Sequence, residues 1–154
     1  MTEKTWSDLE RRLPEWYERA KFGIFIHWGA YSVPAWGEPL GALGEIDDAT
    51  WFAHNPYAEW YFNTIRIDGS PAQRHHRETY GDAPYDAFLD EWRAENFDPR
   101  AWAELFARAG AEYVIPTTKH HDGITLWDAP GTGARNTVRR GPRRDLVGAI
   151  ADAV

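Results

Sequence analysis

The sequence predicts an α/β protein in which parallel strands alternate with helices. Two short apolar runs, at residues 22–26 and 113–118, have the β-branched and aromatic composition of buried strands, and each is followed by polar residues. A capped amphipathic helix leads directly into the second run. Strands that alternate with helices favour a parallel sheet, and the polar loops after such strands are the usual place for a functional site.

The first half of the chain is expected to hold one strand between helices and loops. Pro14 suits the first turn of a helix over residues 14–21, and the strand at residues 22–26 ends at His27. Prolines and glycines predict a long loop over residues 31–50, and loops longer than about 15 residues are usually functional. Thr50 is expected to cap a helix over residues 51–65 that Pro56 divides.

The second half carries the clearest local signals. Residues 66–84 are polar and predict turns, and a helix is expected over residues 85–94. Asp98 and Pro99 begin the next helix, which presents an apolar stripe and ends at Gly110 before the second strand. After a Gly-, Pro- and Arg-rich loop at residues 128–144, Asp145 caps a helix that runs to the last residue. The stripe of the earlier helix consists of Trp102, Leu105 and Phe106.

Composition excludes several classes of protein. A chain of 154 residues is long enough for one domain. The net charge is -7 and the basic residues form no stripe, so we expect no nucleic-acid partner. There is no cysteine, which excludes disulfides and thiolate metal sites. No run has the character of a signal peptide or a membrane span, which favours a soluble cytoplasmic protein without a membrane partner.

Aromatic residues are unusually frequent, with 9 Trp, 7 Tyr and 7 Phe. Core packing explains most rings taken one at a time. The segments HWGAYSVPAWGE and NPYAEWYFN nevertheless mix rings with polar residues and lack the periodicity of a core. A pocket lined by rings with a few polar groups fits these segments, and sugars are a natural ligand for such a pocket.

Two segments, AKFGIFIHWGAYSVPAW and AGAEYVIPTTKHHDGITLW, resemble the N-terminal part of the α-L-fucosidases of glycoside hydrolase family 29. The resemblance continues through AEWYFNTI, FDPRAWAELFARAGAEYV and GPRRDLVGAI in the order found in the family. It implies that residues 1–154 are a partial glycoside hydrolase catalytic domain, the N-terminal portion of a (β/α)8 TIM-like barrel. The barrel is expected to be incomplete, because such a fold typically takes about 250 residues.

The resemblance also implies a fucose-binding site and a fucosylated glycan or glycoside as substrate. Family members bind fucose hydroxyls or stack on the ring with residues that match His27, Glu59, Trp60, His120 and His121. The family's aspartate nucleophile is expected beyond Val154, so no catalytic residue is assigned in this chain. Retaining hydrolysis needs two carboxyl groups about 5–5.5 Å apart, so the 154 residues alone are expected to be inactive. No cofactor is expected.

Two other functions remain open from the residues themselves. A non-catalytic sugar-binding module would use the same rings and histidines. A metal-dependent hydrolase would use His27, His120 and His121, but adjacent residues of an extended segment point to opposite sides, which argues against a shared ion at His120 and His121. His27 could also be a buried structural histidine, Glu59 a surface charge and Trp60 a core ring.

The remaining polar residues have structural interpretations. Asp122 is predicted to be a turn residue. The other histidines, His54, His75 and His76, lie in polar segments and are predicted to be solvated. An incomplete barrel would leave strand edges unpaired, from which we expect self-association.

Overall fold

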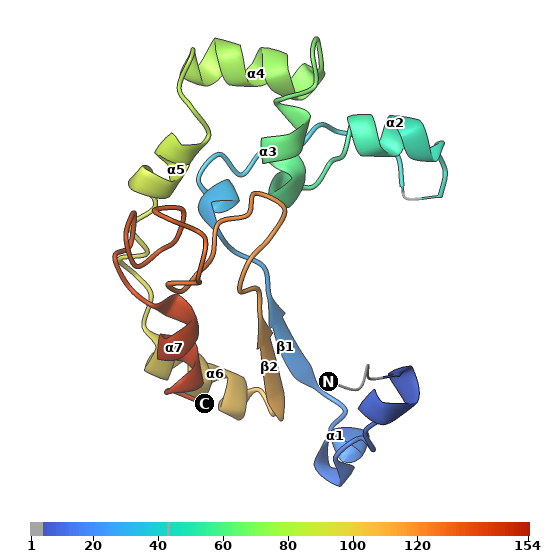
Figure 1. The fold of residues 1–154 in the computed structure, drawn as a ribbon, viewed down its shortest axis with the longest axis vertical. Coiled ribbons are helices and arrows are strands. Elements are labelled where there is room, and N and C mark those ends of the chain that lie inside the picture. Colours follow the sequence, from blue (N-terminus) through green and yellow to red (C-terminus); the bar gives the residue numbers. More distant parts are fainter. Residues whose placement is uncertain (1–4, 43) are drawn as a thin grey trace.

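The computed structural model describes residues 5–42 and 44–154, and it is an α/β structure built on a short parallel sheet (Figure 1). Strand β1 (Gly23–Ile26) pairs in parallel with β2 (Tyr113–Pro116), and Phe25 lies opposite Ile115. The prediction of two parallel strands is confirmed, although β2 ends two residues earlier than expected. Within the described ranges these two strands form the whole sheet, so a closed barrel is not seen.

Helices α6 (Pro99–Arg108) and α7 (Leu146–Ala151) lie beside the sheet and begin as the sequence predicts. The Asp98 carboxylate accepts hydrogen bonds from the backbone N–H groups of Arg100 and Ala101, at 3.0 and 3.1 Å. The Asp145 carboxylate accepts from the Gly148 N–H at 2.7 Å. Both aspartates therefore act as N-caps, which satisfy donors that the first helical turn leaves free.

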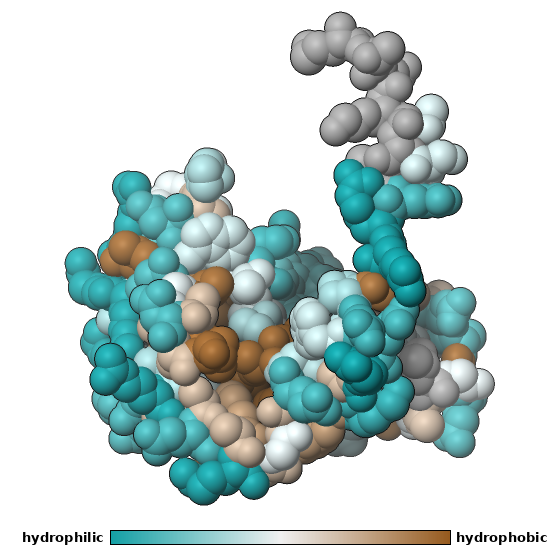
Figure 2. Space-filling model, turned by 90° about the horizontal axis from the view of Figure 1, so that it is seen from below, coloured by the Kyte–Doolittle hydropathy of each residue, from teal (hydrophilic) through white to brown (hydrophobic). Residues whose placement is uncertain are grey.

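The two faces of the sheet differ in how far their side chains are buried. Val114 packs with the main apolar core, which gathers Leu89, Ile124, Leu146 and further rings between the loops and helices. On the opposite face, Phe25 and Ile115 are 62% and 45% exposed. At the lower end of the molecule, apolar side chains gather in a hollow (Figure 2), where a cavity of about 680 Å³ lies between α6, the start of β2 and the residues that follow α7.

The helices of the middle segment depart most from prediction. Residues 66–84 were expected to be turns, but α4 (Pro71–Tyr80) occupies much of this segment. The Ser70 hydroxyl accepts a hydrogen bond from the Gln73 N–H at 3.0 Å, and Pro71 fills the first turn. Only Ala72 and His76 of this helix are buried, so its polar exposed surface hid the helical pattern.

The other short helices keep the predicted order with shifted ends. Helix α2 (Asp48–Ala53) is capped by Asp47, whose carboxylate accepts from the Thr50 N–H at 2.9 Å, so the expected cap at Thr50 is wrong. A break around Pro56 is confirmed, and a 3-10 turn (Ala58–Trp60) then leads into α3 (Tyr61–Thr64). The remaining helices are α1 (Glu15–Arg19) and α5 (Asp86–Glu91), both shorter than expected.

Two further 3-10 turns complete the described chain, at Trp6–Leu9 and at Ala30–Ser32. Gly37 lies so close to the Pro56 carbonyl that a β-carbon would clash with it, which explains why the loop after β1 needs glycine there. None of the helices within the described ranges combines the length and the apolar character needed to span a membrane.

Candidate functional site

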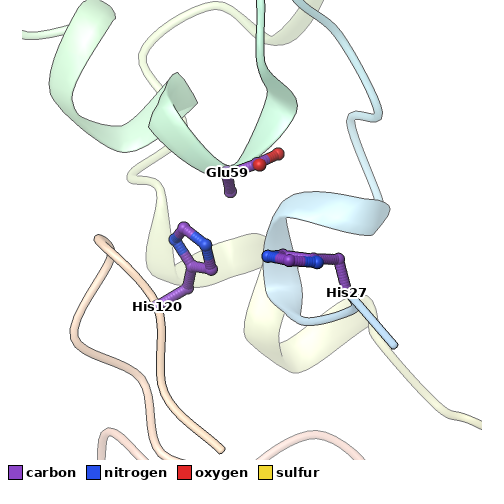
Figure 3. Close-up of side chains that lie close together, drawn as sticks. All are labelled: His27, Glu59 and His120. Carbon is purple, nitrogen blue, oxygen red and sulfur yellow. The ribbon is translucent and has the colours of Figure 1, made fainter. Parts of the chain in front are cut away.

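Three predicted site residues converge beyond the carboxyl ends of the two strands (Figure 3). His27 directly follows β1, His120 lies in the loop after β2, and Glu59 belongs to the 3-10 turn before α3. One nitrogen or carboxylate oxygen from each residue lies within 4.8 Å of the others. The parallel pairing of β1 and β2 explains this arrangement, because the carboxyl ends of parallel strands meet at one edge of the sheet. We call His27, Glu59 and His120 the polar cluster.

A tight turn holds the histidine pair. The Gly123 N–H donates to the His120 carbonyl at 3.0 Å, and Gly123 has a positive φ of 74°, a conformation that glycine adopts without strain. The Asp122 carboxylate accepts from the Ile124 N–H at 3.0 Å, which confirms its role as a turn residue. The same carboxylate accepts from the Tyr85 hydroxyl at 2.9 Å. This link fixes the loop to the start of α5.

The Tyr85–Asp122 link is buried, with Tyr85 5% and Asp122 2% exposed. Burial raises the pKa of Asp122, against the hydrogen bonds from Ile124 and Tyr85 and the charge of Arg135, which lower it. The sequence shows Asp122 beside the histidines but gives no sign of its partner, which lies 37 residues earlier.

His120 is fixed in one tautomer by its own loop. The backbone N–H of His121 donates to His120 Nδ1 at 2.9 Å, so Nδ1 is unprotonated and neutral His120 carries its proton on Nε2. Burial and the neighbouring His121 lower the pKa of His120, while the Glu59 carboxylate acts in the opposite direction. His120 is therefore a neutral hydrogen-bond donor at pH 7.

His121 and Trp60 form a second part of the site. Their ring centroids are 4.2 Å apart, and Trp60 is half-buried while His121 is exposed. The His121 ring lies at 69° to the His120 ring with 4.7 Å between centroids. The histidine pair thus divides its contacts, because His120 joins the polar cluster and His121 packs on Trp60.

Tyr31 packs against the His120 ring, and the sequence did not predict it as a site residue. It belongs to the 3-10 turn after β1, is 4% exposed and contacts the His120 ring edge-on at 5.6 Å. Its hydroxyl is buried and has no hydrogen-bond partner among the described residues. Burial, and then the charges of Glu59 and Asp122, raise the pKa of Tyr31, so the group stays a neutral O–H.

The residues of the polar cluster are close enough to share one ligand, because each offers an atom within 4.8 Å of the others. The two partners of one hydrogen-bonded sugar hydroxyl stand about 4.6 Å apart, and two ligands of one zinc ion stand about 3.4 Å apart, so this limit admits either ligand. Histidine and glutamate are also common zinc ligands. The residues that converge are His27, His120 and Glu59, and not the predicted set of His27, His120 and His121. That part of the metal hypothesis is wrong.

The three histidines predicted to be solvated are all engaged. His54 Nδ1 donates to a Glu38 carboxylate oxygen at 2.8 Å. His75 stacks on Trp36 with 4.3 Å between ring centroids. His76 is 7% exposed and bonded through both nitrogens, so the prediction is wrong most clearly there. A polar sequence neighbourhood did not reveal these tertiary partners.

Comparison with known proteins identifies the family. The family model described as alpha-L-fucosidase matches residues 1–154. This chain belongs to the α-L-fucosidase family. It is 39% identical over 155 residues to alpha-L-fucosidase from Dictyostelium discoideum and 40% identical over 152 residues to human tissue alpha-L-fucosidase. Each of these alignments covers 97% of this chain, but only 30% and 28% of the respective relatives.

Solved α-L-fucosidase structures support the same assignment. An α-fucosidase from Thermotoga maritima, in complex with fucose, superimposes with a TM-score of 0.85 and 53% identity. A second alpha-L-fucosidase structure gives a TM-score of 0.89 and 55% identity. Each match covers 97% of this chain and 34% of the solved chain. The chain thus spans about a third of the length of these family members.

Proposed function

We propose that this chain forms the first strands and helices of a TIM-like barrel and part of the fucose site of an α-L-fucosidase. The whole enzyme would release terminal L-fucose from a fucosylated glycan or glycoside with retention of configuration. The observation that carries the proposal is the convergence of His27, Glu59 and His120 beyond the carboxyl ends of two parallel strands. This is where barrel enzymes place their active sites.

Each residue has a role that its geometry supports. The His120 Nε2–H donates to a sugar hydroxyl, and the Glu59 carboxylate accepts from one. His27 contacts the same hydroxyl region from the end of β1. Trp60 and His121 offer ring surface to the apolar face of fucose, as aromatic residues do in many ligand pockets.

The chemistry needs carboxyl groups beyond this cluster. Retaining hydrolysis uses one carboxylate to attack the anomeric carbon and a second carboxyl to move the proton. Glu59 is the carboxylate of the polar cluster, and Asp122 is buried with both oxygens engaged. We assign neither as the nucleophile, so the 154 residues bind fucose without hydrolysing it. A non-catalytic sugar-binding module would make the same contacts.

The open sheet surface favours association. Phe25 and Ile115 stay exposed on one face, and within the described ranges each strand pairs along one edge only. Unpaired edges and exposed apolar side chains are sites where another chain can add. We propose that the isolated chain associates with itself through this surface.

Calorimetric titration of the purified chain with L-fucose tests the proposal. We expect saturable binding of L-fucose and no binding of D-fucose, its mirror image. In a separate assay, the chain should release no 4-nitrophenol from 4-nitrophenyl α-L-fucoside. Turnover that a Glu59→Ala change abolishes would show that the chemistry is assigned wrongly. Stoichiometric zinc in the purified chain, lost after changing His27 or His120, would favour a metal site instead.

A further inference from the structure

Arg135 lies outside the polar cluster but contacts three separate segments around it. Its guanidinium donates to both carboxylate oxygens of Asp86, at the start of α5, over 3.0 to 3.2 Å. The same group lies over the Phe62 ring of α3, with 5.3 Å between Cζ and the ring centroid. Its Nη1 also lies beside Gly123, where an added β-carbon would stand 3.5 Å away. Arg135 therefore connects α5, α3 and the turn at residues 120–123, which we call the histidine turn.

The backbone and the partial burial of Arg135 hold these contacts in place. The Thr125 N–H donates to the Arg135 carbonyl at 3.3 Å, and the Arg135 N–H donates to the Thr132 carbonyl at 3.0 Å. The Arg135 side chain is 35% exposed, so water screens its pair with Asp86 less than it screens a pair on the open surface. A planar guanidinium can hold a carboxylate with its edge while its face lies on a ring, which a lysine cannot do.

The segments that Arg135 connects carry two members of the polar cluster. Phe62 follows Glu59 by three residues, from the 3-10 turn into α3, and the histidine turn begins with His120. Glu59 and His120 can serve one ligand only if these two segments keep their distance. We infer that Arg135 is a positioning residue, which sets the distance between Glu59 and His120 in the fucose site. This inference rests on the proposed function.

Calorimetric titration with L-fucose measures the effect of Arg135 on binding. Arg135→Met keeps an unbranched side chain and removes the guanidinium. We expect the fucose affinity to fall about three- to tenfold, because a misplaced Glu59 or His120 weakens about one hydrogen bond to the sugar. The variant should stay folded, because Arg140 still donates to the Asp86 carboxylate at 3.2 Å.

Arg66→Met is the matched control. The Arg66 guanidinium lies over the same Phe62 ring, with 5.0 Å between Cζ and the ring centroid. Arg66 is exposed and belongs to the turn directly after α3, so its contact with Phe62 stays within one segment. We expect Arg66→Met to leave the fucose affinity unchanged.

An NMR titration of the His120 ring measures positioning without any sugar. The Glu59 carboxylate raises the pKa of His120, so Glu59→Gln should lower this pKa by an amount that depends on the distance between the two groups. The decrease should be smaller when Arg135→Met is also present, and unchanged when Arg66→Met is present. A loss of stability alone does not alter this difference, because the titration follows folded molecules.

Each other outcome overturns a defined claim. If Arg135→Met leaves either the fucose affinity or the Glu59→Gln effect unchanged, Arg135 is not a positioning residue. Equal losses of affinity in the Arg135 and Arg66 variants would also overturn the inference, because both then act through the Phe62 ring alone. If the wild-type chain does not bind fucose, the proposed function fails, and the NMR comparison still decides the role of Arg135. If circular dichroism shows Arg135→Met unfolded, Asp86→Asn replaces it in both measurements, because it weakens the same bonds from α5.

Discussion

The chain contains two adjacent histidine pairs, and they serve different purposes. His75 and His76 lie on α4, while His120 and His121 lie in the loop after β2. On a helix, neighbours differ by about 100°, so His76 faces the core while His75 stacks on Trp36. In the loop, the paired residues diverge, and His120 meets the polar cluster while His121 meets Trp60.

Hydrogen bonding separates the inner member of each pair. His76 Nε2 donates to the Ala83 carbonyl at 2.8 Å, and its Nδ1 accepts from the Tyr61 hydroxyl at 3.1 Å. His120 uses Nδ1 to hold its own loop, which leaves its Nε2–H for a ligand, and one of its ring nitrogens lies within 4.8 Å of a Glu59 carboxylate oxygen. A histidine whose two nitrogens are both bonded within the protein stabilises the fold, whereas one with a donor directed at a polar cluster can bind a ligand.

The largest expected effect is a loss of stability when a member of the α4 pair, His75 and His76, is changed. His76→Ala leaves the buried Tyr61 hydroxyl without its acceptor and removes packing against Phe88 and Tyr80, so we expect a loss of about 2–4 kcal/mol in the free energy of unfolding. Urea denaturation measures it. His75→Ala, which removes a partly exposed stack, should cost less than about 1 kcal/mol. Equal losses in the two variants would contradict the comparison.

The second-largest expected effect is a loss of fucose affinity when His120 of the loop pair, His120 and His121, is changed. His120→Ala removes the Nε2–H donor, and we expect fucose affinity to fall about tenfold, or 1.4 kcal/mol. The free energy of unfolding should change by less than about 1 kcal/mol, because His120 is only partly buried. Calorimetric titration and urea denaturation together separate the two quantities. A large stability loss with unchanged affinity would place His120 in the same class as His76.

Local signals in the sequence were sufficient for the elements that frame the site. The strand that ends directly before His27, the cap at Asp98 and the strand before His120 are each encoded within a few residues. The position of the polar cluster then follows from parallel pairing and from the family resemblance. Glu59 could not be placed from the strands, because it comes from a turn between two helices, and only the resemblance pointed to it.

The sequence could not predict which residues from separate segments contact each other in the fold. Ser70, Pro71 and Gly81 mark the ends of α4 and are local capping signals for this helix. The burial of His76 depends on Tyr61 and Ala83, and the Tyr85–Asp122 bond joins residues 37 positions apart. Neither contact leaves a local pattern, because both arise from the packing of separate segments.

The smallest expected effect is electrostatic and concerns His120 alone. Its pKa lies below 6.5 in the folded chain, chiefly because of burial, and the unfolded chain takes up a proton near 6.5. As pH falls from 6.5 through the lowered pKa, the unfolded state binds more protons than the folded state, so this group's contribution to stability is lost in that window.

Because Glu59 raises the pKa of His120, Glu59→Gln should lower that pKa further and extend the window to lower pH. Because His121 lowers it, His121→Ala should shift it upward. An NMR titration of the His120 ring proton measures the pKa in both variants, and shifts of the same sign would show that at least one of the two neighbours does not act on His120 through its charge.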